Sequence, residues 1–157
     1  MKRIVFMVFA LLLVACTKEP TVPILPDPAP GQVMPSSEEG LSLELVEDTF
    51  EKSPVTIRTI IRNDSGQTYR LGEFYHIEMK IDGQWHVVTY SDAVFLKNPS
   101  FRDFGNTLKD GETGEQTFSV ETLGITLIQG DYRLVKTFLS SGEPYHEVSV
   151  AAPFFVE

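Results

Sequence analysis

The stretch YHIEMKIDGQWHV, residues 75–87, decides the fold. Up to Ile81, apolar side chains alternate with polar ones, which is the period-two pattern of a strand with one buried face. Asp82-Gly83 is a strong signal for a tight turn between two antiparallel strands. Trp85 and Val87 continue the apolar pattern beyond the turn, so the stretch predicts a β-hairpin.

The same alternation recurs along the rest of the chain. Further strands are expected at residues 41–45, 55–62, 115–120, 131–139 and 145–156. Clusters of Gly, Pro, Asn, Asp and Ser separate these segments and mark turns. After residue 16 no stretch shows a sustained helical period, and only residues 120–123 suit a single helical turn. About seven short strands with turns between them predict an all-β fold, an antiparallel β-sandwich.

The N-terminal residues have the pattern of an export signal. Met1-Lys2-Arg3 is positively charged, and residues 4–14 form an uninterrupted apolar run. As a helix this run reaches only about 17 Å at ~1.5 Å per residue, whereas a bilayer core is ~30 Å thick. Residues 1–15 are therefore expected to be a removable signal peptide and not a membrane span.

The segment Leu13-Val14-Ala15-Cys16 resembles the lipobox of bacterial lipoproteins. The resemblance implies that a signal peptidase recognises Leu13, Val14 and Ala15, and that a diacylglycerol is attached to the Cys16 sulfur. Because two acyl chains anchor stably, the mature protein would begin at Cys16 on the extracytoplasmic face of a bacterial membrane. The alternative is a buried structural cysteine. Cys16 is the only cysteine, so no intrachain disulfide can form.

Residues 16–39 are expected to be a proline-rich linker. Six of the ten prolines lie between Pro20 and Pro35. Proline fixes φ and lacks a backbone N–H, which disfavours both helix and sheet. Two interpretations stay open: a semi-rigid stalk that lifts the domain through the envelope, or a disordered segment without a spacing role. The folded domain is expected over residues 40–157.

Several motifs in residues 40–157 resemble, in their order and spacing, those of the bacterial immunoglobulin-like domain family of surface lipoproteins. They are GLSLE (40–44), IRNDSG (61–66), YHIE (75–78), IDGQW (81–85), LKDGE (108–112) and GDYRLVK (130–136). The resemblance implies an immunoglobulin-like sandwich. It implies no enzyme activity, and it brings neither catalytic residues nor a cofactor.

Two motifs predict how the sandwich is stabilised. Gly130-x-Tyr132 stands just before a strand and is similar to a tyrosine corner, in which the hydroxyl bonds back to nearby backbone. Trp85 is the only tryptophan, and we expect it to fill the core beside the hairpin strands because large aromatic residues dominate burial. The alternative is that Trp85 is a stacking platform for a sugar.

Charge and the lack of catalytic motifs narrow the function. The chain has 22 acidic and 13 basic residues, a net charge of −9, so it repels phosphate backbones and we expect no nucleic-acid partner. It contains neither a Gly-x-Ser-x-Gly elbow nor a phosphate-binding glycine loop.

His76 and His86 could be cross-strand neighbours that share a zinc ion, but no third ligand follows at a metal-site spacing. Acidic pairs such as Asp110-x-Glu112 leave weak calcium binding as an alternative to solvated charge. We therefore expect no metal and no enzyme.

The longest irregular segment, residues 91–107, is the candidate binding loop. Its apolar residues include Phe95, Phe101 and Phe104. Long loops in compact domains are often functional, and an exposed aromatic residue such as Phe101 would anchor a partner. The alternative is that these side chains close the open end of the sandwich and complete its core.

The sequence thus predicts a non-enzymatic, lipid-anchored module outside the cytoplasm. Its membrane contact would be the diacylglycerol on Cys16, and its partner an extracytoplasmic protein or a cell-envelope polymer. Two alternatives remain: a structural envelope protein without a dedicated ligand, or a regulatory lipoprotein that acts on a membrane-bound partner with a basic surface.

Overall fold

The computed structural model describes residues 21–99 and 104–157. The signal-peptide prediction, with Leu13, Val14 and Ala15, lies outside the described residues, as do Cys16 and Phe101. Within the described ranges, no helix has the length and apolar character needed to cross a bilayer.

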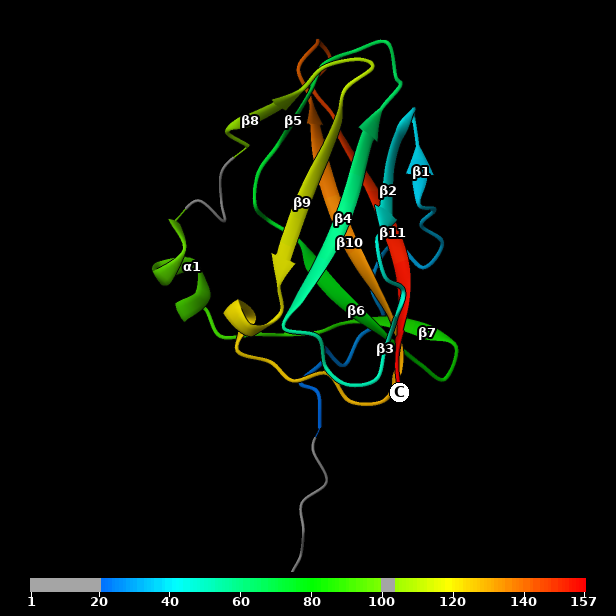
Figure 1. Ribbon diagram of the computed structural model, residues 1–157, viewed down its shortest axis with the longest axis vertical. Coiled ribbons are helices and arrows are strands. Elements are labelled where there is room, and N and C mark those ends of the chain that lie inside the picture. Colours follow the sequence, from blue (N-terminus) through cyan, green and yellow to red (C-terminus); the bar gives the residue numbers. More distant parts are fainter. Residues whose placement is uncertain (1–20, 100–103) are drawn as a thin grey trace, which may run out of the picture.

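The described chain forms two packed β-sheets (Figure 1). The smaller sheet has the strand order β1-β2-β4-β9, with β1 at Ser37–Glu38, β2 at Leu41–Leu45, β4 at Thr56–Asn63 and β9 at Thr113–Ser119. The larger sheet has the order β3-β11-β10-β5-β8, with β6 pairing β10 and β7 pairing β6. Its strands are β3 (Thr49–Phe50), β5 (Tyr69–Leu71), β6 (His76–Ile81), β7 (Gln84–Val87), β8 (Asn106–Leu108), β10 (Gly130–Ser140) and β11 (Glu147–Val156). All pairs are antiparallel except β3 with β11, so the predicted sandwich is confirmed.

The hairpin expected from residues 75–87 is present as β6 and β7. Asp82 and Gly83 both have positive φ, 50° and 83°, as the two central residues of a type I′ turn require. This two-residue turn pairs Ile81 with Gln84 and Lys80 with Trp85. Paired residues share a face of the sheet, so Trp85 lies on the same face as Lys80. Trp85 is half-buried and is not part of the core, which makes the prediction of a core tryptophan wrong.

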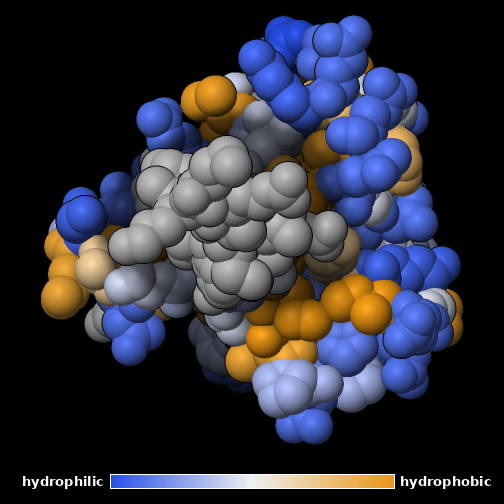
Figure 2. Space-filling model, turned by 90° about the horizontal axis from the view of Figure 1, so that it is seen from below, coloured by the Kyte–Doolittle hydropathy of each residue, from blue (hydrophilic) through white to orange (hydrophobic). Residues whose placement is uncertain are grey.

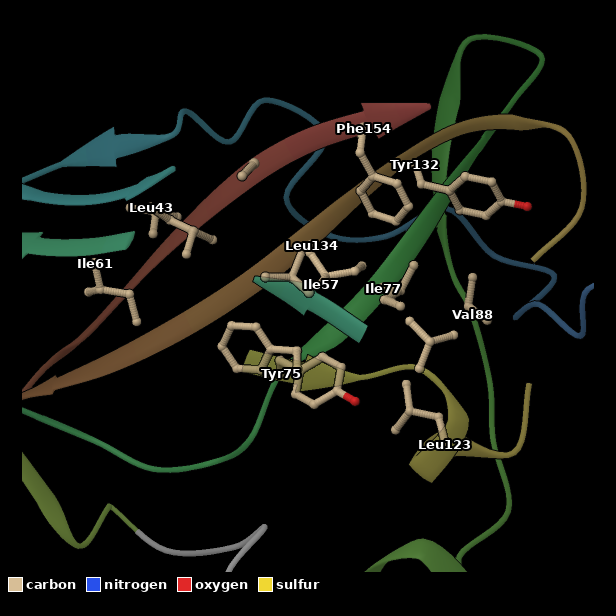
Figure 3. Close-up of a cluster of buried hydrophobic side chains, with 14 of the residues drawn as sticks. Leu43, Ile57, Ile61, Tyr75, Ile77, Val88, Leu123, Tyr132, Leu134 and Phe154 are labelled. Atoms are coloured by element: carbon tan, nitrogen blue, oxygen red, sulfur yellow. The ribbon is translucent and has the colours of Figure 1, made fainter. Parts of the chain in front are cut away.

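The core fills the space between the two sheets (Figure 3). In β4 every second residue is buried, so Ile57 and Ile61 face Leu134 and Phe154 of the larger sheet. Tyr132 packs its ring against Phe154 and donates its hydroxyl hydrogen to the Ile128 carbonyl at 2.8 Å. The predicted tyrosine corner is therefore confirmed, and it fixes the loop that precedes β10.

Short helical segments, among them α1 and η2, lie between some of the strands of the described chain. The helix α1 (Ala93–Lys97) lies in the segment that was expected to be irregular. The 3-10 helix η2 (Glu121–Leu123) occupies the single turn that the sequence suggested. In α1, Val94 is buried while Leu96 is 80% exposed, so the helix packs one side against the sandwich.

The structure differs most from the sequence prediction in the segment that was expected to be a linker. Residues 21–36, here called the strap, pack along the larger sheet, and residues 37–38 form β1. Val22 and Ala29 are only 8% and 4% exposed. Both interpretations of this segment, a semi-rigid stalk that lifts the domain and a disordered segment, are therefore wrong for residues 21–39. Proline removes donors but leaves every carbonyl free to accept, and a sheet edge can use those carbonyls.

Candidate functional site

The strap extends the larger sheet at the edge of β7. The Leu25 N–H donates to the Val87 carbonyl at 2.9 Å, and the Ala29 N–H donates to the Trp85 carbonyl at 2.7 Å. The Pro23 carbonyl accepts from the Thr89 N–H at 2.8 Å, and Ile24 forms a bridge with Val88. The edge of β7 is thus covered by a segment of its own chain, which blocks pairing with another strand there.

Gln32 supplies a second set of bonds between the strap and the hairpin. Its side-chain oxygen accepts the Trp85 N–H at 2.9 Å. Its amide nitrogen donates to the carbonyls of Trp85 and Ala29 at 2.9 and 2.8 Å. One side chain therefore satisfies both backbone groups of Trp85, as a neighbouring strand would.

Arg133 joins the strap to the middle of the sheet. Its Nε donates to Glu78 Oε2 at 2.7 Å, and its terminal nitrogens donate to the carbonyls of Gly31 and Gln32. Its guanidinium also lies 4.6 Å from the centre of the Trp85 ring, a cation–π distance. Arg133 is 3% exposed and Glu78 is 2% exposed. The strap therefore buries this part of the outer face of the larger sheet, including a charged pair.

The same cluster controls the charge of Glu78. Its Oε1 lies 3.0 Å from Nε2 of His76, and its Oε2 accepts from Arg133. Burial alone raises the pKa of Glu78, but hydrogen bonds from His76 and Arg133 outweigh it and hold the pKa below its ordinary value. Glu78 is consequently ionised at neutral pH, and its charge is compensated within the sheet.

An aromatic groove opens beside this cluster, at the open end of the hairpin. It has a volume of about 310 Å³. Its lining residues are Phe74, His76, Val87, Val88, Thr89, Tyr90 and Phe95. The rings of Tyr90 and Phe95 lie 5.9 Å apart, and those of Phe74 and His76 lie 6.2 Å apart. Phe95 comes from α1, so the helix forms one wall and the hairpin forms the other.

The structure separates the predicted loop residues. Phe95 lines the groove and also packs against the core. Phe104 is half-buried just before β8 and is not among the groove residues. Phe74 and Tyr90 were not among the residues expected from the sequence. A signal for them was present, because Phe74 precedes β6 and Tyr90 follows β7, and a hairpin brings those two ends together.

A second buried cation lies on the inner face of β10. Lys136 is fully buried, and its Nζ donates to the carbonyls of Gly72 and Phe74. The Nζ also lies 5.4 Å from the centre of the Phe118 ring. Burial lowers the pKa of Lys136 to about 7, although the carboxylate of Glu73 opposes this shift. With 0% exposure, the Lys136 amine is closed to a substrate in this conformation.

The histidines do not form the pair that a zinc site would need. The register places Met79 opposite His86, and Val135 opposite His76. His86 Nδ1 lies 3.2 Å from the Leu25 carbonyl of the strap. In the part of the chain that the structure describes, no three His, Cys, Asp or Glu side chains are grouped to hold a metal ion.

Two sheets packed face to face and a tyrosine corner define an immunoglobulin-like sandwich. Residues 37–154 match the family model of the bacterial Ig-like domain, and the chain belongs to that family. The matched range begins at β1, so the strap at residues 21–36 precedes it. A comparison with curated proteins finds no match.

Proposed function

We propose that this chain is a non-enzymatic, lipid-anchored Ig-like module that binds a protein outside the cytoplasm through the aromatic groove. The lipobox-like residues 13–16 support the anchoring. Bacterial Ig-like family membership agrees with a location outside the cytoplasm and with a role in binding. The groove is the single observation that carries the binding role.

The groove suits an apolar or aromatic side chain of a partner. Its walls are three aromatic side chains, Phe74, Tyr90 and Phe95, while His76 adds a polar group at hydrogen-bonding distance from Glu78. Aromatic side chains in a preformed cleft give much apolar contact for little loss of side-chain entropy. The chain carries a net charge of −9, which favours a partner whose surrounding surface is basic.

The binding role is tested by crosslinking on intact cells with Phe95→Ala and the matched control Leu96→Ala. Leu96 is the next residue of α1, is 80% exposed and does not line the groove. We expect Phe95→Ala to reduce partner capture at least tenfold while Leu96→Ala leaves it unchanged. Equal capture by both variants, with a large loss of melting temperature for Phe95→Ala, would show that Phe95 only completes the core. Capture of a polysaccharide in place of a protein would identify an envelope polymer as the ligand.

The anchoring is tested separately with Cys16→Ser. Without the thiol no thioether to diacylglycerol can form, so metabolic lipid labelling should be lost and the protein should leave the membrane fraction. Retention of the lipid label by Cys16→Ser would refute the lipoprotein assignment.

A further inference from the structure

Few residues separate the proposed anchor from the folded body. Only five residue steps separate Cys16 from Thr21, the first described residue. A fully extended chain of that length spans at most about 18 Å, at ~3.3–3.6 Å per residue. This argument rests on the proposed lipid anchoring of Cys16, and it implies that the folded body stays close to the bilayer surface.

The position of the strap also determines which end of the sandwich faces the bilayer. Its first residues lie at the lower end of the molecule in Figure 1, where the C-terminus and the loops 51–55 and 124–129 also lie. Val22 is buried, and Leu25 and Ala29 are hydrogen-bonded to β7, so the chain is held from its first described residues. The opposite end, with the turns 64–67 and 141–144, points away from the tether.

The lower end carries exposed apolar side chains. Val55 is 62% exposed and Leu25 is 46% exposed. A shallow hollow of about 450 Å³ is lined in part by Leu127, Ile128 and Val156. Figure 2 views the molecule from this end and shows hydrophobic surface there, interrupted by hydrophilic residues. The two exposed side chains and the hollow together make this end a candidate contact surface.

We propose that this lower end rests on the lipid surface, with Val55 and Leu25 in the headgroup region. The same end carries Glu51, Glu121 and Glu157 against Lys52. The contact is therefore apolar, and anionic lipids weaken it. Tethering by a short chain raises the effective concentration, so a contact that is weak in free solution becomes populated.

The proposal is tested on the mature form, residues 16–157, coupled through its single thiol to a maleimide lipid in phosphatidylcholine vesicles. The reference is the same protein with its thiol blocked, mixed with the same vesicles. Hydrogen exchange should slow at least about threefold in peptides covering 51–55 and 124–129. Peptides covering 64–67 and 141–144 should be unchanged. Equal exchange everywhere, or slowing at the far end, would overturn the proposal.

Two matched variants and a change of lipid sharpen the result. Val55→Glu should abolish the slowing, whereas Val33→Glu should leave it intact. Val33 is 97% exposed and stands two residues before Pro35, whose carbonyl bonds to Ala151 in the middle of β11. Replacing a third of the lipid with phosphatidylglycerol should reduce the slowing. Stronger contact with phosphatidylglycerol, or loss with both variants, would refute the apolar contact. Because the coupling is chemical, these outcomes do not depend on whether cells acylate Cys16.

Discussion

Two buried basic residues, three positions apart on β10, lie on opposite faces of the sheet and have different neighbours. Arg133 faces outward, where Glu78, the strap carbonyls and Trp85 surround it. Lys136 faces inward, where two carbonyls and the Phe118 ring are its neighbours. Arg133 thus has a carboxylate within hydrogen-bonding distance. Among the described residues the hydrogen bonds of the Lys136 amine go to carbonyls, Glu73 acts on it only through its charge, and burial lowers the pKa of Lys136 to about 7. A buried charge is either paired or has its pKa shifted towards neutrality.

The difference between Arg133 and Lys136 shows that the strap buries an ion pair on the outer face of the sheet. In a sandwich whose sheet faces water, Glu78 and Arg133 would be a surface ion pair of small value. The strap covers them and turns the pair into an interior link between residues 21–36 and the family domain. Lys136 does not depend on the strap, because its hydrogen-bond partners belong to the segment before β6 and its ring contact belongs to β9.

The largest effect should come from Arg133→Ala. The substitution leaves the Glu78 carboxylate buried without its main partner and removes the bonds to Gly31 and Gln32. Breaking one side of a buried pair costs about 3–5 kcal/mol. Urea denaturation should show a loss of this size, whereas the exposed control Arg58→Ala, paired with Glu47 at 3.9 Å, should lose less than about 1 kcal/mol. Similar losses for both variants would contradict the buried link.

Lys136 should make stability depend on pH in the alkaline range. The pKa is about 7 in the folded chain and 10.5 without burial, so between these values the unfolded chain binds the extra proton. Stability should therefore rise with pH from about 7 to 10, by up to about 1.4 kcal/mol per unit. Lys136→Met should flatten this slope in denaturation curves measured at several pH values. An unchanged slope would assign it to another group.

Tyr132→Phe should have the smallest effect. It removes one hydrogen bond, from the Tyr132 hydroxyl to the Ile128 carbonyl, and leaves the ring packed on Phe154. The expected loss of stability is about 1 kcal/mol, measured by thermal unfolding. Tyr145→Phe is the control, since Tyr145 is 66% exposed and its loss of a hydroxyl should change nothing. If the two variants melt together, the corner contributes no stability.

Local patterns in the sequence predicted the sandwich but not the strap. Alternation located the strands, Asp82-Gly83 located the hairpin, and Gly130-x-Tyr132 located the corner. The proline-rich segment was misjudged because its bonds are long-range: its partners lie about 50 to 100 residues away, at Trp85 and Arg133. The error at Trp85 has the same origin, since its face depends on the register and its cover is the strap.

The groove was predicted only in part, for a related reason. Phe95 belongs to an apolar loop that is recognisable from the local sequence. Phe74 and Tyr90 lie 16 residues apart and come together only when the hairpin forms. The five-residue helix α1, which places Phe95, is too short to show a helical period.

The central claim is that residues 21–36 belong to the folded body, and hydrogen exchange in the mature chain tests it most directly. The amides of Leu25 and Ala29 bond to Val87 and Trp85, so they should exchange at least about a hundredfold more slowly than an unstructured peptide. Gln32→Ala should raise the exchange rate at Ala29, while Gln84→Ala, an exposed control, should not. Exchange of Leu25 and Ala29 at the unstructured rate in the native chain would contradict the strap and restore the free stalk.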